Sequence, residues 1–179
     1  MNNIESLCLS ESSVDPYQIA CRLMAEREIP MHGPIHHYLD GAAFLTALHN
    51  AGMDFDLPSA LDELERRAEK MPGATCGMWG VCGSAASLGA ALAVIHGTGP
   101  LSDNDFYKDN LRLTSQILAR EAEIGGPRCC KRNAFTALLV GIDFVRDTYG
   151  VKLEKSPVVG GFHGNNAQCL EGRCPYFRE

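Results

Sequence analysis

Glycine and proline residues break this chain into stretches whose apolar residues recur with helical spacing. Asp15-Pro16 opens the first stretch, which we expect to run to Glu28, because proline is favoured at the first position of a helix. Further helices are expected over 34–51, 57–71, 84–96, 102–123 and 129–149. The pattern therefore predicts an all-α, single-domain bundle of about six helices.

The expected domain organisation has three parts. Residues 1–14 are predicted to be a flexible N-terminus, and residues 15–150 form the helical domain. Residues 151–179 are an irregular, cysteine-bearing tail that we expect to pack back on the domain, with one short extended piece over 152–159. A length of 179 residues suits one domain with a core of its own.

Charge and composition exclude several classes of function. The net charge is −6, which argues against non-specific nucleic-acid binding, because that needs a basic face. No apolar run is long enough to span a membrane, and the N-terminus has no signal-peptide pattern, so we expect a cytoplasmic protein. Eight cysteines in a reducing compartment favour metal or redox chemistry over a disulfide scaffold.

Three segments share one layout, in which a glycine or proline break is followed by reactive residues and then by a helix. They are MHGPIHH (31–37), CGMWGVCGSAASLG (76–89) and GGPRCCKR (125–132). Helix N-termini carry free N–H groups and about half a positive charge, so cysteines placed there are expected to be thiolates. We expect the three helix starts to meet in one electropositive pocket.

Six cysteines are the candidate metal ligands. Cys76, Cys82, Cys129 and Cys130 are preferred, and Cys169 and Cys174 are second choices that could ligate a further metal. Only CLEGRC has the spacing of a zinc knuckle, so an iron–sulfur cluster of the [4Fe–4S] type is favoured and zinc is the alternative. A vicinal disulfide or buried free thiols are the simpler alternatives, and for Cys8 and Cys21 a structural role is preferred.

Histidines and basic residues complete the candidate site. His36, His37 and Lys131 are the candidate catalytic residues: one of the two histidines would move protons, and Lys131 together with Arg128 would hold an anionic substrate. Another three residues, His32, Arg128 and Trp79, are candidates for substrate binding. The alternatives are helix capping by His32 and core packing by Trp79. His49 and His96 are expected to be structural, and the role of His163 is open.

The three motifs resemble those of domain-of-unknown-function family 5714, whose members carry MHGPxHH, MWGxCG-like and GGPRCCKR segments. The similarity covers residues from about 30 to the C-terminal CPYF. It implies an origin in anaerobic bacteria and archaea, sometimes beside radical-chemistry or methyltransferase proteins, and this favours an oxygen-sensitive metal centre. A looser similarity to the GCAxxG redox family is confined to residues around Cys82 and carries no residue roles.

We therefore expect an iron–sulfur-dependent protein of anaerobic metabolism, with an enzyme preferred. An open iron of the cluster would act on a small anionic or sulfur-containing substrate, with sulfur transfer or desulfuration as the expected reaction. The alternatives are a non-enzymatic metal or redox accessory protein, a sensor, and a metal-free dithiol oxidoreductase. The expected partners are a redox, methyltransferase or radical-chemistry protein and a second copy of the chain, with no nucleic acid or membrane.

Overall fold

The computed structural model describes residues 3–178, and their regular secondary structure is entirely helical. It consists of eight α-helices and two short 3₁₀ turns: α1 (Asn3–Ser10), α2 (Pro16–Ala25), α3 (His36–Asn50), α4 (Leu57–Ala68), α5 (Thr75–Met78), α6 (Gly83–Ile95), α7 (Asp105–Ile124), α8 (Cys130–Tyr149), η1 (His163–Asn165) and η2 (Glu171–Arg173). The all-α class is confirmed, with eight described α-helices where about six were expected.

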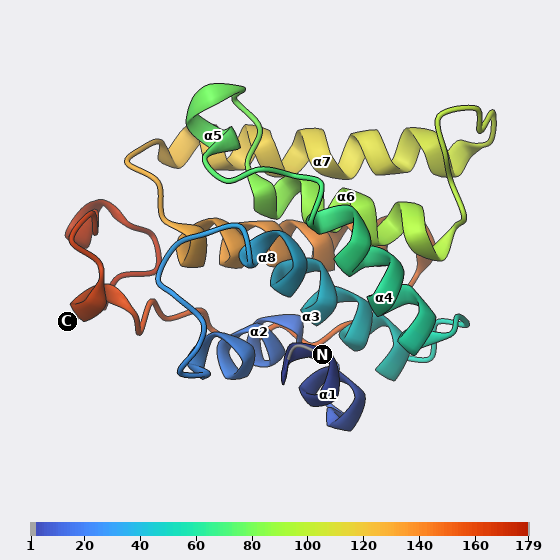
Figure 1. The fold of residues 1–179 in the computed structure, drawn as a ribbon, viewed down its shortest axis with the longest axis horizontal. Coiled ribbons are helices and arrows are strands. Elements are labelled where there is room, and N and C mark those ends of the chain that lie inside the picture. Colours follow the sequence, from blue (N-terminus) through green and yellow to red (C-terminus); the bar gives the residue numbers. More distant parts are fainter. Residues whose placement is uncertain (1–2, 179) are drawn as a thin grey trace.

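Helix α3 is the centre of the bundle. It packs against α1, α2, α4, α6 and α8, and all of its residues from 36 to 48 are buried. In Figure 1, α1 and α2 lie below α3, and α6 and then α7 lie above it. Gly41 lets α3 approach α6 closely, because a Cβ atom there would lie 2.9 Å from the backbone oxygen of Ser87.

The N-terminal segment differs from the flexible chain that we expected. Residues 3–10 form α1, whose Ile4 and Cys8 are buried in the core. Cys21 packs against the same core, in keeping with a structural role for both cysteines. The amphipathic character of α1 is weak over so few residues, so packing against α3 rather than sequence pattern holds this helix in place.

Several helix boundaries also differ from expectation. The first long helix, α2, starts as expected with Asp15 as its N-cap but ends at Ala25, three residues before Glu28. Pro34 and Ile35 form a turn ahead of α3, and α7 is capped by Asn104, whose side chain accepts a hydrogen bond from the Tyr107 N–H. Local turn chemistry therefore decides these boundaries.

The tail runs back over the bundle without forming a strand within residues 151–178. It is held to the start of α2, where the Ser156 N–H donates to Asp15 and Tyr17 Oη bonds both backbone groups of Val159. Its last part lies at the end of the bundle where α8 begins (Figure 1). None of the helices described over 3–178 is long and apolar enough to cross a membrane.

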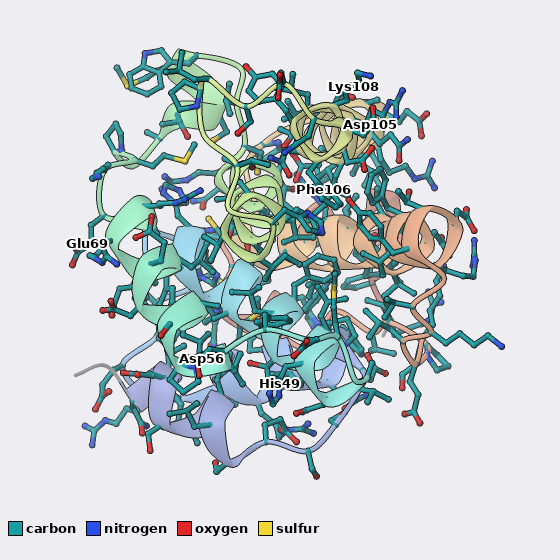
Figure 2. All side chains as sticks on the ribbon, turned by 90° about the vertical axis from the view of Figure 1, so that its right-hand side faces the viewer. His49, Asp56, Glu69, Asp105, Phe106 and Lys108 are labelled. Carbon is teal, nitrogen blue, oxygen red and sulfur yellow. The ribbon has the colours of Figure 1, made fainter. Side chains whose placement is uncertain are left out.

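The opposite end of the bundle is closed by aromatic contacts (Figure 2). His49 packs edge-on against Phe55, with ring centroids 5.7 Å apart, and Phe106 stacks on His96 at 3.9 Å. Both histidines lie in packing contacts at helix ends, as expected of structural residues. The reactive residues singled out in the sequence lie elsewhere.

Candidate functional site

The starts of α3, α6 and α8 lie together at one end of the bundle, beside α5 and the tail (Figure 1). A small hollow there, which we call the junction pocket, is lined by residues from all three starts. Its lining includes His36, His37, Cys82, Gly83, Cys129 and Cys130. The expected convergence of the three helix starts is therefore confirmed.

A larger hollow of about 330 Å³, which we call the outer groove, adjoins the junction pocket. The two share four residues, namely Cys76, Cys82, Arg128 and Asn133. Glu121 of α7 lines the outer groove as well, so this groove brings a carboxyl group next to a cysteine thiol. The groove gives a ligand enough room to approach Cys76 and Cys82 from outside.

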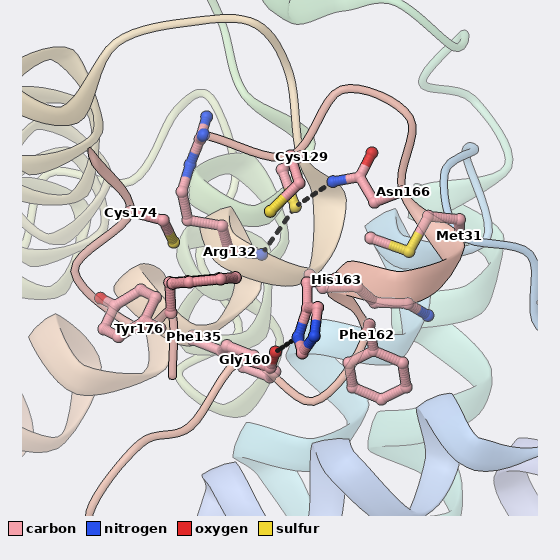
Figure 3. Close-up of a pocket in the computed structure, with 13 residues that line it drawn as sticks. Met31, Cys129, Arg132, Phe135, Gly160, Phe162, His163, Asn166, Cys174 and Tyr176 are labelled. Carbon is pink, nitrogen blue, oxygen red and sulfur yellow. Dashed lines mark hydrogen bonds between the residues drawn. The ribbon is translucent and has the colours of Figure 1, made fainter. Parts of the chain in front are cut away.

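A third hollow of about 30 Å³, the tail pocket, lies between α8 and the tail (Figure 3). Cys129, Cys169 and Cys174 line it, together with aromatic rings that include Phe135, Phe162 and Tyr176. Cys129 lines both the tail pocket and the junction pocket. Each of the six candidate ligand cysteines therefore lines the junction pocket or the tail pocket, and Cys129 lines both.

The cysteines at 76, 82, 129, 130, 169 and 174 are all free thiols, so the adjacent pair is not a vicinal disulfide. Within residues 3–178, no three side chains of His, Cys, Asp or Glu are gathered closely enough to hold a single metal ion. The described side chains thus surround shared hollows rather than one point.

Hydrogen-bond donors are directed at three of the six sulfur atoms, and the simplest case is the Glu171 N–H, which donates to Cys169 Sγ at 3.3 Å. Asn133 Nδ2 lies 3.2 Å from Cys82 Sγ, and Asn166 Nδ2 lies 3.5 Å from Cys129 Sγ. The backbone N–H of Arg132 also donates to Cys129 Sγ at 3.4 Å, so this cysteine is the N-cap of α8 (Figure 3). Sulfur is a weak acceptor as a thiol, so such donors suit a thiolate or a metal-bound sulfur better.

The expectation that these cysteines are thiolates is not met. Burial raises the pKa of Cys82 to about 12, and the neighbouring Glu121 carboxylate adds to the rise. The pKa values of Cys129 and Cys130 are raised as well, again chiefly by burial. Helix N–H groups and Arg132 pull the pKa of Cys129 down, but desolvation outweighs them.

The chain belongs to a family of unknown function, DUF5714, which it matches over residues 4–177. The match covers nearly the whole chain and all three motif segments. No curated protein and no solved structure matches the chain.

Each of the three clustered histidines has polar partners, and those of His36 are the Pro30 carbonyl and Lys131 Nζ, which lie 3.2 and 3.4 Å from its Nε2. His32 Nδ1 accepts a long hydrogen bond of 3.5 Å from the Cys130 N–H, and its Nε2 donates to Asn166 at 3.2 Å. Both nitrogens are used, so His32 links the start of α8 to the tail instead of facing a substrate. His37 Nδ1 lies 3.3 Å from the Met71 carbonyl, which makes Nδ1 the protonated nitrogen.

The other side of the His37 ring faces the junction pocket. It lies against Gly83, and a Cβ atom on Gly83 would collide with the ring. Burial lowers the pKa of His37, so the ring is neutral at pH 7 and its Nε2 is a proton acceptor. The close approach therefore requires glycine at the start of α6.

The basic residues of GGPRCCKR have separate roles. Lys131 is 3% exposed, its pKa is lowered to about 8 by burial, and it lines the tail pocket. Arg132 donates to the carbonyls of Gly125 and Pro127 at 2.8 and 2.9 Å, which ties down the loop before α8. Arg128 is exposed and lines the junction pocket and the outer groove, so it is the cation available to a ligand.

Trp79 does not line any of the three hollows. It is 61% exposed at the end of α5, and Met78 beside it is 72% exposed. Neither the expected contact with substrate nor the alternative of core packing describes its position.

Sequence reasoning missed four polar residues of this end of the bundle, namely Asp40, Glu121, Asn133 and Asn166. Asp40 carried a signal, because it is a charged residue in the apolar stretch YLDGAAFLTAL and lies one helical turn after His36. Asn133 directly follows the GGPRCCKR motif. Nothing in the local sequence distinguishes Glu121 from the solvated acidic residues of α7.

Proposed function

We propose that this chain binds an iron–sulfur cluster at the junction pocket and uses it on a small anionic or sulfur-containing substrate. The observation that carries the proposal is the set of amide donors directed at Cys82 and Cys129. Donors to ligand sulfur stabilise thiolate ligation and tune the centre that it holds. Three of the four cysteines Cys76, Cys82, Cys129 and Cys130 are the ligands, which leaves one iron of the cluster without a cysteine, and Cys169 and Cys174 are a further pair on the tail side.

The arrangement of the candidate metal ligands favours a cluster over zinc. A structural zinc ion needs all four ligand atoms within about 2.3 Å of one point. Among the described residues, no three side chains of His, Cys, Asp or Glu lie close enough together to ligate one ion. A cluster has several irons, so its cysteines need not approach one another so closely. Four cysteines around two adjoining hollows fit that requirement.

The chain's own residues then bind the substrate and move its protons. A cluster with one iron free of cysteine supplies a Lewis acid or a sulfur acceptor. Arg128 binds the negative charge of the substrate at the outer groove, because its guanidinium has no described hydrogen bond of its own. His37 accepts or returns a proton at Nε2 in the junction pocket. Sulfur transfer or desulfuration is the reaction we propose.

A second candidate is a metal-free dithiol protein. The observation that favours it is the position of Cys129, which is adjacent to Cys130 and faces Cys174 across the tail pocket (Figure 3). A thiol that reaches two neighbours can exchange a disulfide between them. The protein would then serve as an accessory or sensor for a redox, methyltransferase or radical-chemistry partner in the cytoplasm of an anaerobe.

Anaerobic purification followed by a visible spectrum and counts of iron, zinc and sulfide separates these candidates. Broad absorption near 400 nm with matching iron and sulfide supports the cluster. Stoichiometric zinc without colour contradicts it, and a metal-free protein with reversible thiol oxidation supports the dithiol candidate. Arg128→Ala and His37→Gln should abolish sulfide release from small thiocarbonyl anions while the iron content stays unchanged. Retained release would remove these two roles.

A further inference from the structure

A short segment between α4 and α6, residues 74–80, is only loosely attached to the bundle, and we call it the cap. It contains α5, which lies at the margin of the molecule in Figure 1. All residues of the cap are exposed except Thr75, and the large side chains of Met78 and Trp79 are 72% and 61% exposed. The cap therefore has no apolar face packed against a helix of the bundle.

The hydrogen bonds of the cap are local. The Met78 N–H donates to the Ala74 carbonyl at 3.1 Å, and the Trp79 N–H donates to the Thr75 carbonyl at 2.8 Å. Among the hydrogen bonds of the residues described, none joins the cap to a segment outside residues 74–81. The cap can therefore move as a unit without breaking hydrogen bonds to the bundle.

Both ends of the cap have a backbone conformation that suits a hinge. Gly80 has a φ of +67°, and nothing lies within 4 Å of the place where a Cβ atom would be. At the other end, Ala74 has a φ of 66°, in the left-handed region that residues with a side chain rarely adopt. Strain at Ala74 and open space at Gly80 both favour rotation of the backbone at these two positions.

The cap separates a small hollow from a larger one. Ala74, Thr75 and Cys76 line the junction pocket, whose volume of about 40 Å³ holds only a few water molecules. Cys76, Gly77 and Gly80 line the outer groove of about 330 Å³. A ligand larger than water therefore fits in the outer groove, and it enters the junction pocket only when a wall between the two hollows moves.

The other walls of these hollows are held in place. Gly125 and Arg128 line the outer groove as well, and Arg132 fixes their loop by donating to the carbonyls of Gly125 and Pro127 at 2.8 and 2.9 Å. The starts of α3, α6 and α8 belong to long helices that pack against one another. The cap is therefore the wall that can move.

The four candidate ligands at this end of the bundle fall into two groups. Cys82 and Cys129 are the N-caps of α6 and α8 and are 9% and 8% exposed, and Cys130 is the first residue of α8. Cys76 is exposed and belongs to the cap. Long helices therefore hold three of the cysteines, and the fourth moves with the cap.

We propose that residues 74–80 are a hinged cap whose opening admits ligands to the junction pocket, and that Cys76 is the cysteine left out of the ligand set. The conformation described here is the closed one. Cys82, Cys129 and Cys130 are then the three ligands, and Cys76 lies at the entrance, where it lines both hollows together with Arg128. The place of Cys76 rests on the proposed function, whereas the opening of the cap does not.

Alkylation by iodoacetamide tests the cap without metal. The full chain is treated with a chelator, and tandem mass spectrometry gives the labelling rate of each cysteine at one fixed pH. Gly80→Ala should raise the rates of Cys82 and Cys130 together by about fivefold, because a side chain at a left-handed position strains the closed cap. Cys8 is 0% exposed in the core, and it should stay unlabelled because the bundle remains folded.

Gly97→Ala is the matched control. Gly97 also has a positive φ, of +59°, with nothing within 4 Å, and it lies beyond the end of α6 that is farther from the cap. The substitution adds similar strain there, so the rates of Cys82 and Cys130 should not change. Equal rises in the two variants would indicate general unfolding, and a rise confined to Cys82 would indicate distortion next to the substitution. Either result, or no rise at all, would overturn the cap.

Iron and sulfide counts after anaerobic reconstitution test the place of Cys76. Cys76→Ser should keep the wild-type content, and Cys82→Ser should lose most of it. Equal content in the two variants, whether kept or lost, would overturn the assignment of Cys76. A wild type that binds no iron would remove the proposed function and this assignment together, while the labelling rates would still decide whether the cap opens.

Discussion

Glu121 should make this protein less stable as the pH rises from about 4.5 to 7. Burial raises the pKa of its carboxyl from 4.5 to about 7, although a hydrogen bond with Cys82 acts in the opposite direction. The folded chain therefore holds this proton over a range in which the unfolded chain has released it. The free energy of unfolding falls across that range, because the unfolded state binds fewer protons there.

The magnitude follows from the size of the rise. A change from 4.5 to about 7 is worth ~3.4 kcal/mol at 1.36 kcal/mol for each pKa unit. Glu121 is partly exposed, and solvent screening lowers this to about 2 kcal/mol. Glu121→Gln mimics the protonated carboxyl, so the variant should match the wild type near pH 4 and exceed it by about 2 kcal/mol at pH 8.

Urea unfolding followed by far-ultraviolet circular dichroism at pH 4, 6 and 8 measures this difference. The matched control is Glu123→Gln on the same helix, because Glu123 is exposed and pairs with Arg120 on the surface. It should change stability by less than about 1 kcal/mol at every pH. A gap between Glu121→Gln and the wild type that is the same at pH 4 and pH 8 would refute the reasoning.

Three further substitutions test the fold and the site. Gly41→Ala should lower the free energy of unfolding by about 1–3 kcal/mol in urea titrations, because the new methyl group meets the α6 backbone at Ser87. Asp15→Ala should cost about 1–2 kcal/mol in the same assay, since it removes the cap of α2 and a bond to the tail. Arg132→Met should speed tryptic cleavage after Arg128 without unfolding the bundle, because it frees two loop carbonyls. An unchanged stability or cleavage rate would contradict the corresponding contact.

The helical class and the converging helix starts could be predicted from the sequence because both depend on local patterns. Glycine and proline breaks set the starts of α2 and α8 within a residue or two. The short helix α5 could not be predicted, because its TCGM sequence lies among glycines that favour a loop. α1 also depends on tertiary packing that no local pattern contains.

The chemical state of the site was harder to predict than its position. Their positions at helix starts suggested low pKa values for Cys82 and Cys129. Burial by the tail and the neighbouring helices raises both pKa values instead, and the local sequence does not reveal that burial. Lys131 looked like a residue that reaches substrate, yet α8 turns it inward toward His36 and the Pro30 carbonyl. Side-chain direction at a helix start depends on the fold around it.

The most direct test of the proposed cluster is the iron and sulfide content of matched cysteine variants after anaerobic reconstitution. Cys129→Ser should lose most of its iron and sulfide, because Cys129 is the ligand that lines both the junction pocket and the tail pocket. Cys21→Ser should keep the wild-type content, since Cys21 packs against the core and lines none of the three hollows. Equal iron and sulfide in the two variants, or none in the wild type, would contradict a cluster at this site.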